Sequence, residues 1–173
     1  MRTRYVTAAA MLLLVGTWQV EADEPEIVST TAVYSLDGLH CPPCASTVER
    51  SLKRAAGVRS ARVDYRTKSA QIEFDESKLS AQKLAKLIAA TPHMMGGDMH
   101  YSGSLMLHIA GIADEATAKK ATDALKGVPG VAKVQVRAKQ KSIAVRFASK
   151  GGATTRQVLD ALNSVGLQAT LKP

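Results

Sequence analysis

The chemistry of this 173-residue chain centres on its two cysteines, Cys41 and Cys44, which are separated by Pro42 and Pro43. A spacing of three residues lets both sulfurs turn toward one point, and the thiolate is the form of cysteine that binds metal. Two thiolates suit soft ions such as Cu(I), Hg(II) and Cd(II), whereas a structural Zn(II) site generally needs four protein ligands. We predict one metal site with both cysteines as ligands, Cu(I) as the preferred ion, and Hg(II), Cd(II) or Zn(II) as alternatives.

The same pair of cysteines allows three other interpretations. A thiol-disulfide oxidoreductase would use it as a redox site, but the preceding aromatic residue and the opposing cis-proline of thioredoxin-like enzymes are not recognisable here. The pair could instead form a plain structural disulfide in an exported protein, or only sense metal in an interaction module. The sequence shows no Ser/His/Asp arrangement and no phosphate-cradling glycine loop. We therefore expect no enzyme and keep metal binding as the first interpretation.

A second group of candidate ligands, His93, Met94 and Met95, lies in the segment 91–101. We expect this segment to be a loop that emerges at the same end of the sheet as the loop with the cysteines. Methionine thioethers favour Cu(I), so these three residues are candidates for auxiliary metal ligands. The alternative is that the methionines simply pack, because methionine fills irregular gaps in protein cores.

The elements that must position these residues follow from an internal repeat. A shift of 73 residues aligns Gly38 with Gly111. The same shift aligns further identical residues: Leu52 with Leu125, Gly57-Val58 with Gly130-Val131, Val63 with Val136, Lys68-Ser69 with Lys141-Ser142, and Phe74 with Phe147. Because repeats determine how the whole fold is interpreted, we predict two homologous units, 30–101 and 104–173, with a short junction at Ser102-Gly103.

Each unit is expected to run strand, helix, strand, strand, helix, strand. In the first unit the apolar alternation at 32–36 predicts a strand, and the helical spacing of Cys44, Val48 and Leu52 predicts a helix with one buried face. Alternation on both sides of 66–68 predicts a hairpin. The sequence therefore predicts an α+β fold of two tandem ferredoxin-like βαββαβ domains, each an antiparallel sheet with both helices on one face.

The residues around the cysteines resemble a known family, the heavy-metal-associated domains of copper chaperones, copper-transporting ATPases and periplasmic mercury-binding proteins. The family pattern is Gly-Met-x-Cys-x-x-Cys, followed by a helix and a Gly-Val pair. It is matched by Gly38, Cys41, Cys44 and Gly57-Val58, with Leu39 in the methionine position. Leucine fills a similar volume, so we expect it to support the loop from beneath as methionine does.

The resemblance extends to the second unit only in its fold, because Asp114 and Thr117 stand where the first unit has cysteines. For the first unit it implies metal trafficking, buffering or detoxification by exchange of thiolate ligands. It also implies a partner of the same chemistry, either another CxxC metalloprotein or a metal-transporting ATPase.

The N-terminus resembles a secretory signal peptide over residues 1–22, since a basic start is followed by a short apolar run and a small-x-small exit. Residues 23–29 are expected to be a linker. The apolar run is shorter than the roughly 20 residues of a spanning helix, so we expect an exported, periplasmic or extracellular protein without stable membrane insertion. The net charge is +8, but only 4% of residues are aromatic and the basic residues are scattered, so we expect no nucleic-acid partner.

Overall fold

The computed structural model of the chain describes residues 29–112 and 114–171. The predicted signal peptide and nearly all of the predicted linker therefore lie outside the described residues. Within the described part, no helix is both long and apolar enough to cross a membrane. The fold is α+β with a single open antiparallel sheet, in agreement with the predicted ferredoxin-like class.

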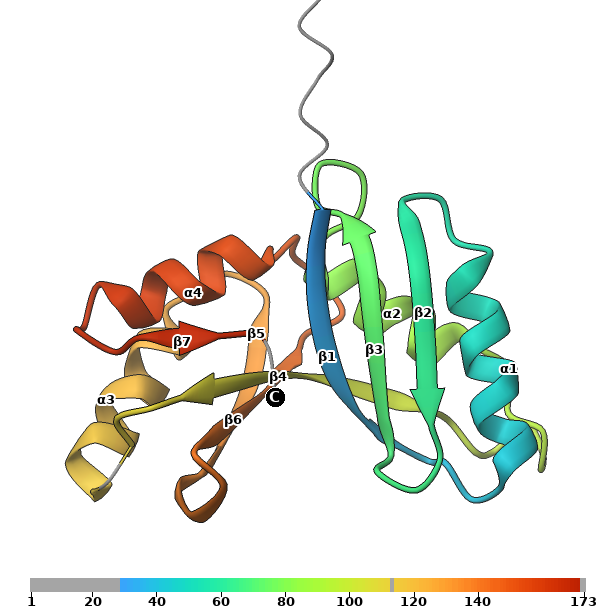
Figure 1. Cartoon of the computed structure of the whole chain (residues 1–173), viewed down its shortest axis with the longest axis horizontal. Helices are drawn as coiled ribbons and strands as arrows, with labels where there is room; N and C mark the ends of the chain where they lie inside the picture. Colours follow the sequence, from blue (N-terminus) through green and yellow to red (C-terminus); the bar gives the residue numbers. More distant parts are fainter. Residues whose placement is uncertain (1–28, 113, 172–173) are drawn as a thin grey trace, which may run out of the picture.

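The order strand, helix, strand, strand, helix, strand occurs twice along the chain (Figure 1). The first half consists of β1 (Ser29–Asp37), α1 (Pro42–Lys53), β2 (Val58–Asp64), β3 (Ser69–Asp75), α2 (Ala81–Ala90) and β4 (Ser102–Ile109). The second half continues with α3 (Glu115–Lys126), β5 (Val131–Arg137), the short 3-10 helix η1 (Ala138–Gln140), β6 (Ser142–Phe147), α4 (Thr155–Asn163) and β7 (Ala169–Thr170).

The strand β4 belongs to both halves. Its first part, from Ser102 to Met106, pairs with β1, and the part from Leu105 to His108 pairs with β6. The short β7 pairs with the last residues of β4. The sheet therefore runs unbroken in the order β2-β3-β1-β4-β6-β5, and the fourth strand of the first half is also the first strand of the second.

This arrangement differs from the predicted junction at Ser102-Gly103, which would have separated two units with six elements each. Both residues lie inside β4. A side chain at Gly103 would place its Cβ 2.7 Å from Cδ1 of Ile88 in α2. The glycine is thus a site of close packing between a helix and a strand, and it does not mark a turn.

The helices of the first half cover one face of the sheet, and Figure 1 shows α1 and α2 beside β1, β2 and β3. The buried hydroxyl of Tyr34 in β1 donates to the carbonyl oxygen of Ala81 in α2 over 2.8 Å. As predicted, Cys44, Val48 and Leu52 lie on the buried stripe of α1. The opposite face of the sheet carries the alternate, mostly polar residues and has no helix packed on it among the described elements.

The backbone repeats together with the sequence. Lys68 and Lys141 precede equivalent strands, and both adopt a positive φ, 50° and 48°. Gly57 and Gly130, which precede β2 and β5, have φ values of 95° and 97°. The identities found by shifting the sequence therefore correspond to equivalent turns in the two halves.

Gln82 connects the two halves where α2 meets the chain before α4. Its buried side-chain amide donates to the carbonyl oxygens of Ala148 (2.6 Å) and Lys150 (2.9 Å) and accepts from the amide of Ala153 (3.1 Å). The backbone amide of Gln82 also donates to the Ala153 carbonyl over 3.1 Å. One side chain of the first half thus satisfies three backbone groups of the second.

Glu76 makes a further contact between the halves. Its carboxylate accepts hydrogen bonds from the backbone amide and the hydroxyl of Thr155, the first residue of α4. A carboxylate at the N-terminus of a helix is favourable, because the free amides there carry partial positive charge.

We expect Gln82→Ala to lower the free energy of unfolding by about 3 kcal/mol, because it leaves buried backbone groups of the second half without partners. Urea denaturation followed by circular dichroism measures the change. The matched control is Gln168→Ala at an exposed position, which we expect to change stability by less than about 0.5 kcal/mol. Equal effects of the two substitutions would contradict the role given to Gln82.

Candidate metal centre

Cys41 is the N-cap residue of α1 and directly precedes Pro42, the first residue of the helix. It has extended backbone angles (φ −147°, ψ 154°), and its Sγ accepts the backbone amide hydrogen of Cys44 over 3.3 Å. Pro42 and Pro43 occupy the first two helical positions, where an N–H would have no partner within the helix. The Pro-Pro pair therefore starts the helix without removing a helical hydrogen bond, and Cys44 falls in the first turn as predicted.

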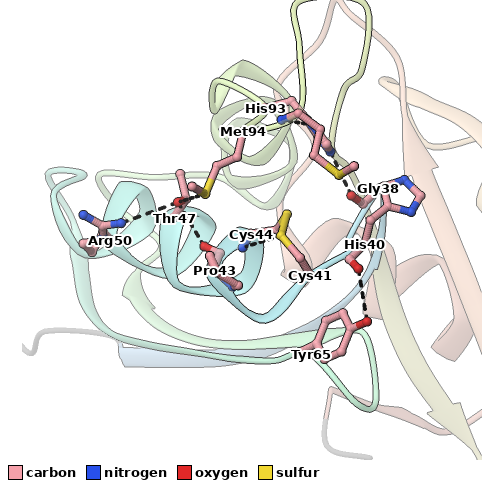
Figure 2. The surroundings of a disulfide bond; sticks show 11 residues. Gly38, His40, Cys41, Pro43, Cys44, Thr47, Arg50, Tyr65, His93 and Met94 are labelled. Carbon is pink, nitrogen blue, oxygen red and sulfur yellow. Dashed lines mark hydrogen bonds between the residues drawn. A yellow bond between two sulfur atoms is a disulfide. The ribbon is translucent and has the colours of Figure 1, made fainter.

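The two cysteines are joined as a disulfide, with their Cα atoms 5.2 Å apart (Figure 2). Cys44 is fully buried, whereas Cys41 is partly exposed. The structure thus shows the oxidised form of the pair, and only the reduced form can offer thiolates to a metal. In that form the N-terminus of α1 would stabilise negative charge on both sulfurs.

Contacts on its buried side fix the loop before the cysteines. Gly38 has a φ of 89°, and a Cβ at this position would lie 2.5 Å from the carbonyl oxygen of His100. Leu39, in the position where the family has methionine, is 1% exposed and belongs to the core. On the other side of the loop, the hydroxyl of Tyr65 donates to the carbonyl oxygen of His40 over 3.1 Å.

His93 links the loop after α2 to the cysteine loop. Its Nε2 lies 3.0 Å from the carbonyl oxygen of Gly38, and its Nδ1 accepts from the backbone amide of Met95 over 3.2 Å. Because Nδ1 is the acceptor, Nε2 carries the hydrogen that is donated to Gly38. The ring also packs against Tyr101, with centroids 4.5 Å apart. Both nitrogens are therefore engaged within the protein, and binding a metal through His93 would require breaking one of these bonds.

Met94 and Met95 are the large hydrophobic residues most exposed among the described residues, at 56% and 61%. The Sδ of Met94 accepts from the hydroxyl of Thr47 in α1 over 3.1 Å. Figure 2 shows Met94 above the start of α1, on the side where the disulfide lies. The loop after α2 therefore lies next to the cysteine loop, as predicted. Met94 and Met95 are at the surface of the molecule.

In the described part of the chain, no group of three or more His, Cys, Asp or Glu side chains is placed to hold a metal ion. If both sulfurs bind one ion, they form a soft, incomplete donor set of the kind that suits Cu(I) or Hg(II) better than structural Zn(II).

In the second half, α3 starts in the same way as α1, but the two corresponding positions are not cysteines. Asp114 occupies the position of Cys41, and its carboxylate accepts the amide hydrogen of Thr117 over 2.6 Å. Hydrogen bonds from Thr117 lower the pKa of Asp114 below its usual value. The stabilisation from this cap is therefore present at neutral pH and is lost as the pH falls through that lowered pKa.

Comparison with known proteins finds a family match in the first half of the chain. Residues 33–93 match the heavy-metal-associated domain family over the segment that holds both cysteines. This segment of the chain belongs to that family. The matched segment runs from Val33 within β1 through α2 to His93 in the loop that follows.

The relatives of this domain include two kinds of transport protein. The chain is 28% identical over 157 residues to the copper-transporting ATPase HMA5 of Oryza sativa subsp. japonica, covering 88% of the chain but 15% of the ATPase. It is 36% identical over 56 residues to the mercuric transport protein periplasmic component of Serratia marcescens, covering 32% of the chain and 62% of that protein. The chain therefore spans less than two thirds of either relative.

Among solved structures, oxidized MerP from Ralstonia metallidurans CH34 is 31% identical to the chain. The likeness covers 44% of the chain and 96% of that structure, with a TM-score of 0.38.

Sequence reasoning found the cysteines and the loop of His93 but missed the residues that hold this region in place. These residues include Tyr65, which donates to the His40 carbonyl, and Thr47, which donates to Met94. Their contacts join residues far apart in the sequence, so no local pattern signals them. The fixed spacing of the family motif, in contrast, is sufficient to place Cys44 in the first turn of α1.

We expect His93→Phe to keep the ring contact with Tyr101 while removing both hydrogen bonds of the imidazole. The loss of two hydrogen bonds should lower the free energy of unfolding by about 1–3 kcal/mol. Hydrogen exchange should also become faster at the amide of Met95. The control is His100→Phe, which changes an exposed side chain near the same loop. Unchanged exchange at Met95 in His93→Phe would show that His93 does not hold this loop.

Proposed function

We propose that this protein binds a single soft metal ion, Cu(I) in preference, through Cys41 and Cys44 and passes it on by exchange of thiolate ligands. The observation that carries the proposal is the pair of sulfurs at the N-terminus of α1, where one cysteine caps the helix and the other lies in its first turn. The names of the relatives, a copper-transporting ATPase and a mercuric transport protein, support a soft ion as the cargo.

The difference in exposure between the cysteines supports an order of exchange. Cys44 is fully buried and Cys41 is partly exposed. An incoming thiolate would therefore bind the ion on the side of Cys41, and Cys41 would release it first while Cys44 still held it. No electrons are transferred, because the ion keeps its charge and only its sulfur ligands change. Another CxxC metalloprotein or a metal-transporting ATPase would be the partner.

Met94 and Met95 are proposed as auxiliary ligands ahead of His93. Both side chains are exposed, and the Sδ of Met94 accepts one hydrogen bond from Thr47, whereas both nitrogens of His93 are hydrogen-bonded. A thioether contact would favour Cu(I) over Hg(II) and Cd(II) only modestly, since all three ions are soft.

The decisive test replaces the cysteines by the residues of the second half. We expect the reduced protein to hold one Cu(I) per chain against a competing chelator. The double variant Cys41→Asp with Cys44→Thr should keep its fold, because Asp114 and Thr117 start α3 in the same way. Its affinity should fall by more than about a hundredfold, since even outer-shell changes at metal sites cost up to that much. Binding by a folded double variant would rule out the site.

Export is the second part of the proposal, and it depends on the segment 1–22. When the full chain is produced in a bacterium with two membranes, we expect the mature protein in the periplasm with an intact mass that begins at Asp23. Ala22→Arg should block processing, because cleavage requires a small residue at that position. An unprocessed chain in the cytoplasm would contradict export.

The disulfide between Cys41 and Cys44 favours one alternative function, a thiol-disulfide oxidoreductase. In that case the partly exposed Cys41 would attack a substrate disulfide and Cys44 would resolve the mixed disulfide. The rate at which dithiothreitol reduces a disulfide substrate, measured with and without the metal-free protein, distinguishes the redox function from metal transfer. Turnover that disappears in Cys41→Ser would support the redox function.

A further inference from the structure

A groove crosses the face of the sheet that has no helix packed on it. We name it the junction groove and define it by Val33, Lys68, Gln71, Met106, Arg137 and Ser142, which are among its lining residues. It encloses about 470 Å³, within the roughly 300–1,000 Å³ of small-molecule sites. Neither cysteine lines it, so it is separate from the metal centre.

The shared strand creates this groove. Val33 of β1 and Met106 of β4 are directly paired and form an apolar floor. The turns before β3 and β6 lie on either side of β4, and Figure 1 shows both hairpin ends on the same lower edge of the molecule. Equivalent backbone hydrogen bonds hold these turns to β1 and β4. The amide of Leu36 donates to the Lys68 carbonyl oxygen over 2.7 Å, and the amide of Ile109 donates to the Lys141 carbonyl oxygen over 2.9 Å.

The groups around the floor are cationic or can donate hydrogen bonds. Lys68 approaches from the first half and Arg137 from the second, and no carboxylate is among the lining residues. Within the described part of the chain, neither cation has an ion-pair partner. His108 and hydroxyl and amide groups complete the rim. The site therefore combines an apolar base with uncompensated positive charge.

Ser142 provides an independent indication. Its Oγ is buried and has no hydrogen-bond partner among the residues that the structure describes. Buried hydroxyl groups in folded proteins are nearly always hydrogen-bonded. The residue itself is partly exposed and lines the groove, so rotation of its side chain would bring this unused donor to an oxygen anion bound there.

We propose that the junction groove binds a small organic anion, with a carboxylate between Lys68 and Arg137 and an apolar portion on Val33 and Met106. The charges define the polar end of the ligand, since both side chains donate to carboxylate oxygens and Arg137 can do so through two N–H groups. The floor defines the other end, because apolar area is removed from water when it is covered. This binding does not depend on the cysteines or on their oxidation state.

The experiment titrates the oxidised full-length protein with hexanoate at constant ionic strength and follows backbone amide signals by NMR. We expect saturable shifts at Ser69, Met106 and Ser142, with a Kd of about 1 mM for so small a ligand. Signals near Cys44 should not move. Hexanamide, which has the same apolar portion without the charge, should give no saturable shifts.

The double variant Lys68→Gln with Arg137→Gln should weaken hexanoate binding by about tenfold or more. Its matched control is Lys141→Gln with Arg62→Gln, which removes the same charge. Lys141 shares the positive φ of Lys68, and neither control residue lines the groove. Binding that persists in the first variant, falls equally in the control, fails to saturate, or occurs equally with hexanamide would overturn the proposal.

Discussion

The pairing of β4 with β1 on one edge and with β6 on the other is the constraint on which the rest of the structure depends. It brings the two halves into one sheet and places α2 of the first half against the chain that precedes α4. The contacts of Gln82 and Glu76 are possible only in this arrangement. The shared strand also leaves the two hairpin turns on either side of a common face, where their cations are close to an apolar floor.

In the loop that contains Cys41 and Cys44, one atom has two roles. The Sγ of Cys41 accepts the amide hydrogen of Cys44 and so helps to start α1, and it is also half of the sulfur pair. Around it, the loop is braced by Tyr65 at His40 and by His93 at Gly38. The loop is therefore held mainly through its own backbone carbonyls, and neither of these two contacts uses a cysteine sulfur.

Much of the fold followed from local patterns. The buried stripe of α1, the hairpin between β2 and β3 and the repeat were all visible, since each depends on residues close in sequence or on direct identity. The shared strand was missed because Gly103 serves equally as a turn residue and as a point of close packing. Only the position of Ile88 distinguishes the two roles. In the same way, the proximity of His93 to the cysteine loop followed from topology, but the use of both its nitrogens depends on the exact place of the Gly38 carbonyl and could not be read from the chain.

The shared strand also bears on how such a chain can change over generations. In a tandem of separate domains, either copy can be deleted, exchanged or moved to another gene. Here, loss of the second half together with β4 would leave β1 with an unpaired edge, and exposed edges of this kind promote aggregation. A shortened chain could therefore keep the edge of β1 covered only by keeping β4, the strand on which the second half is also built.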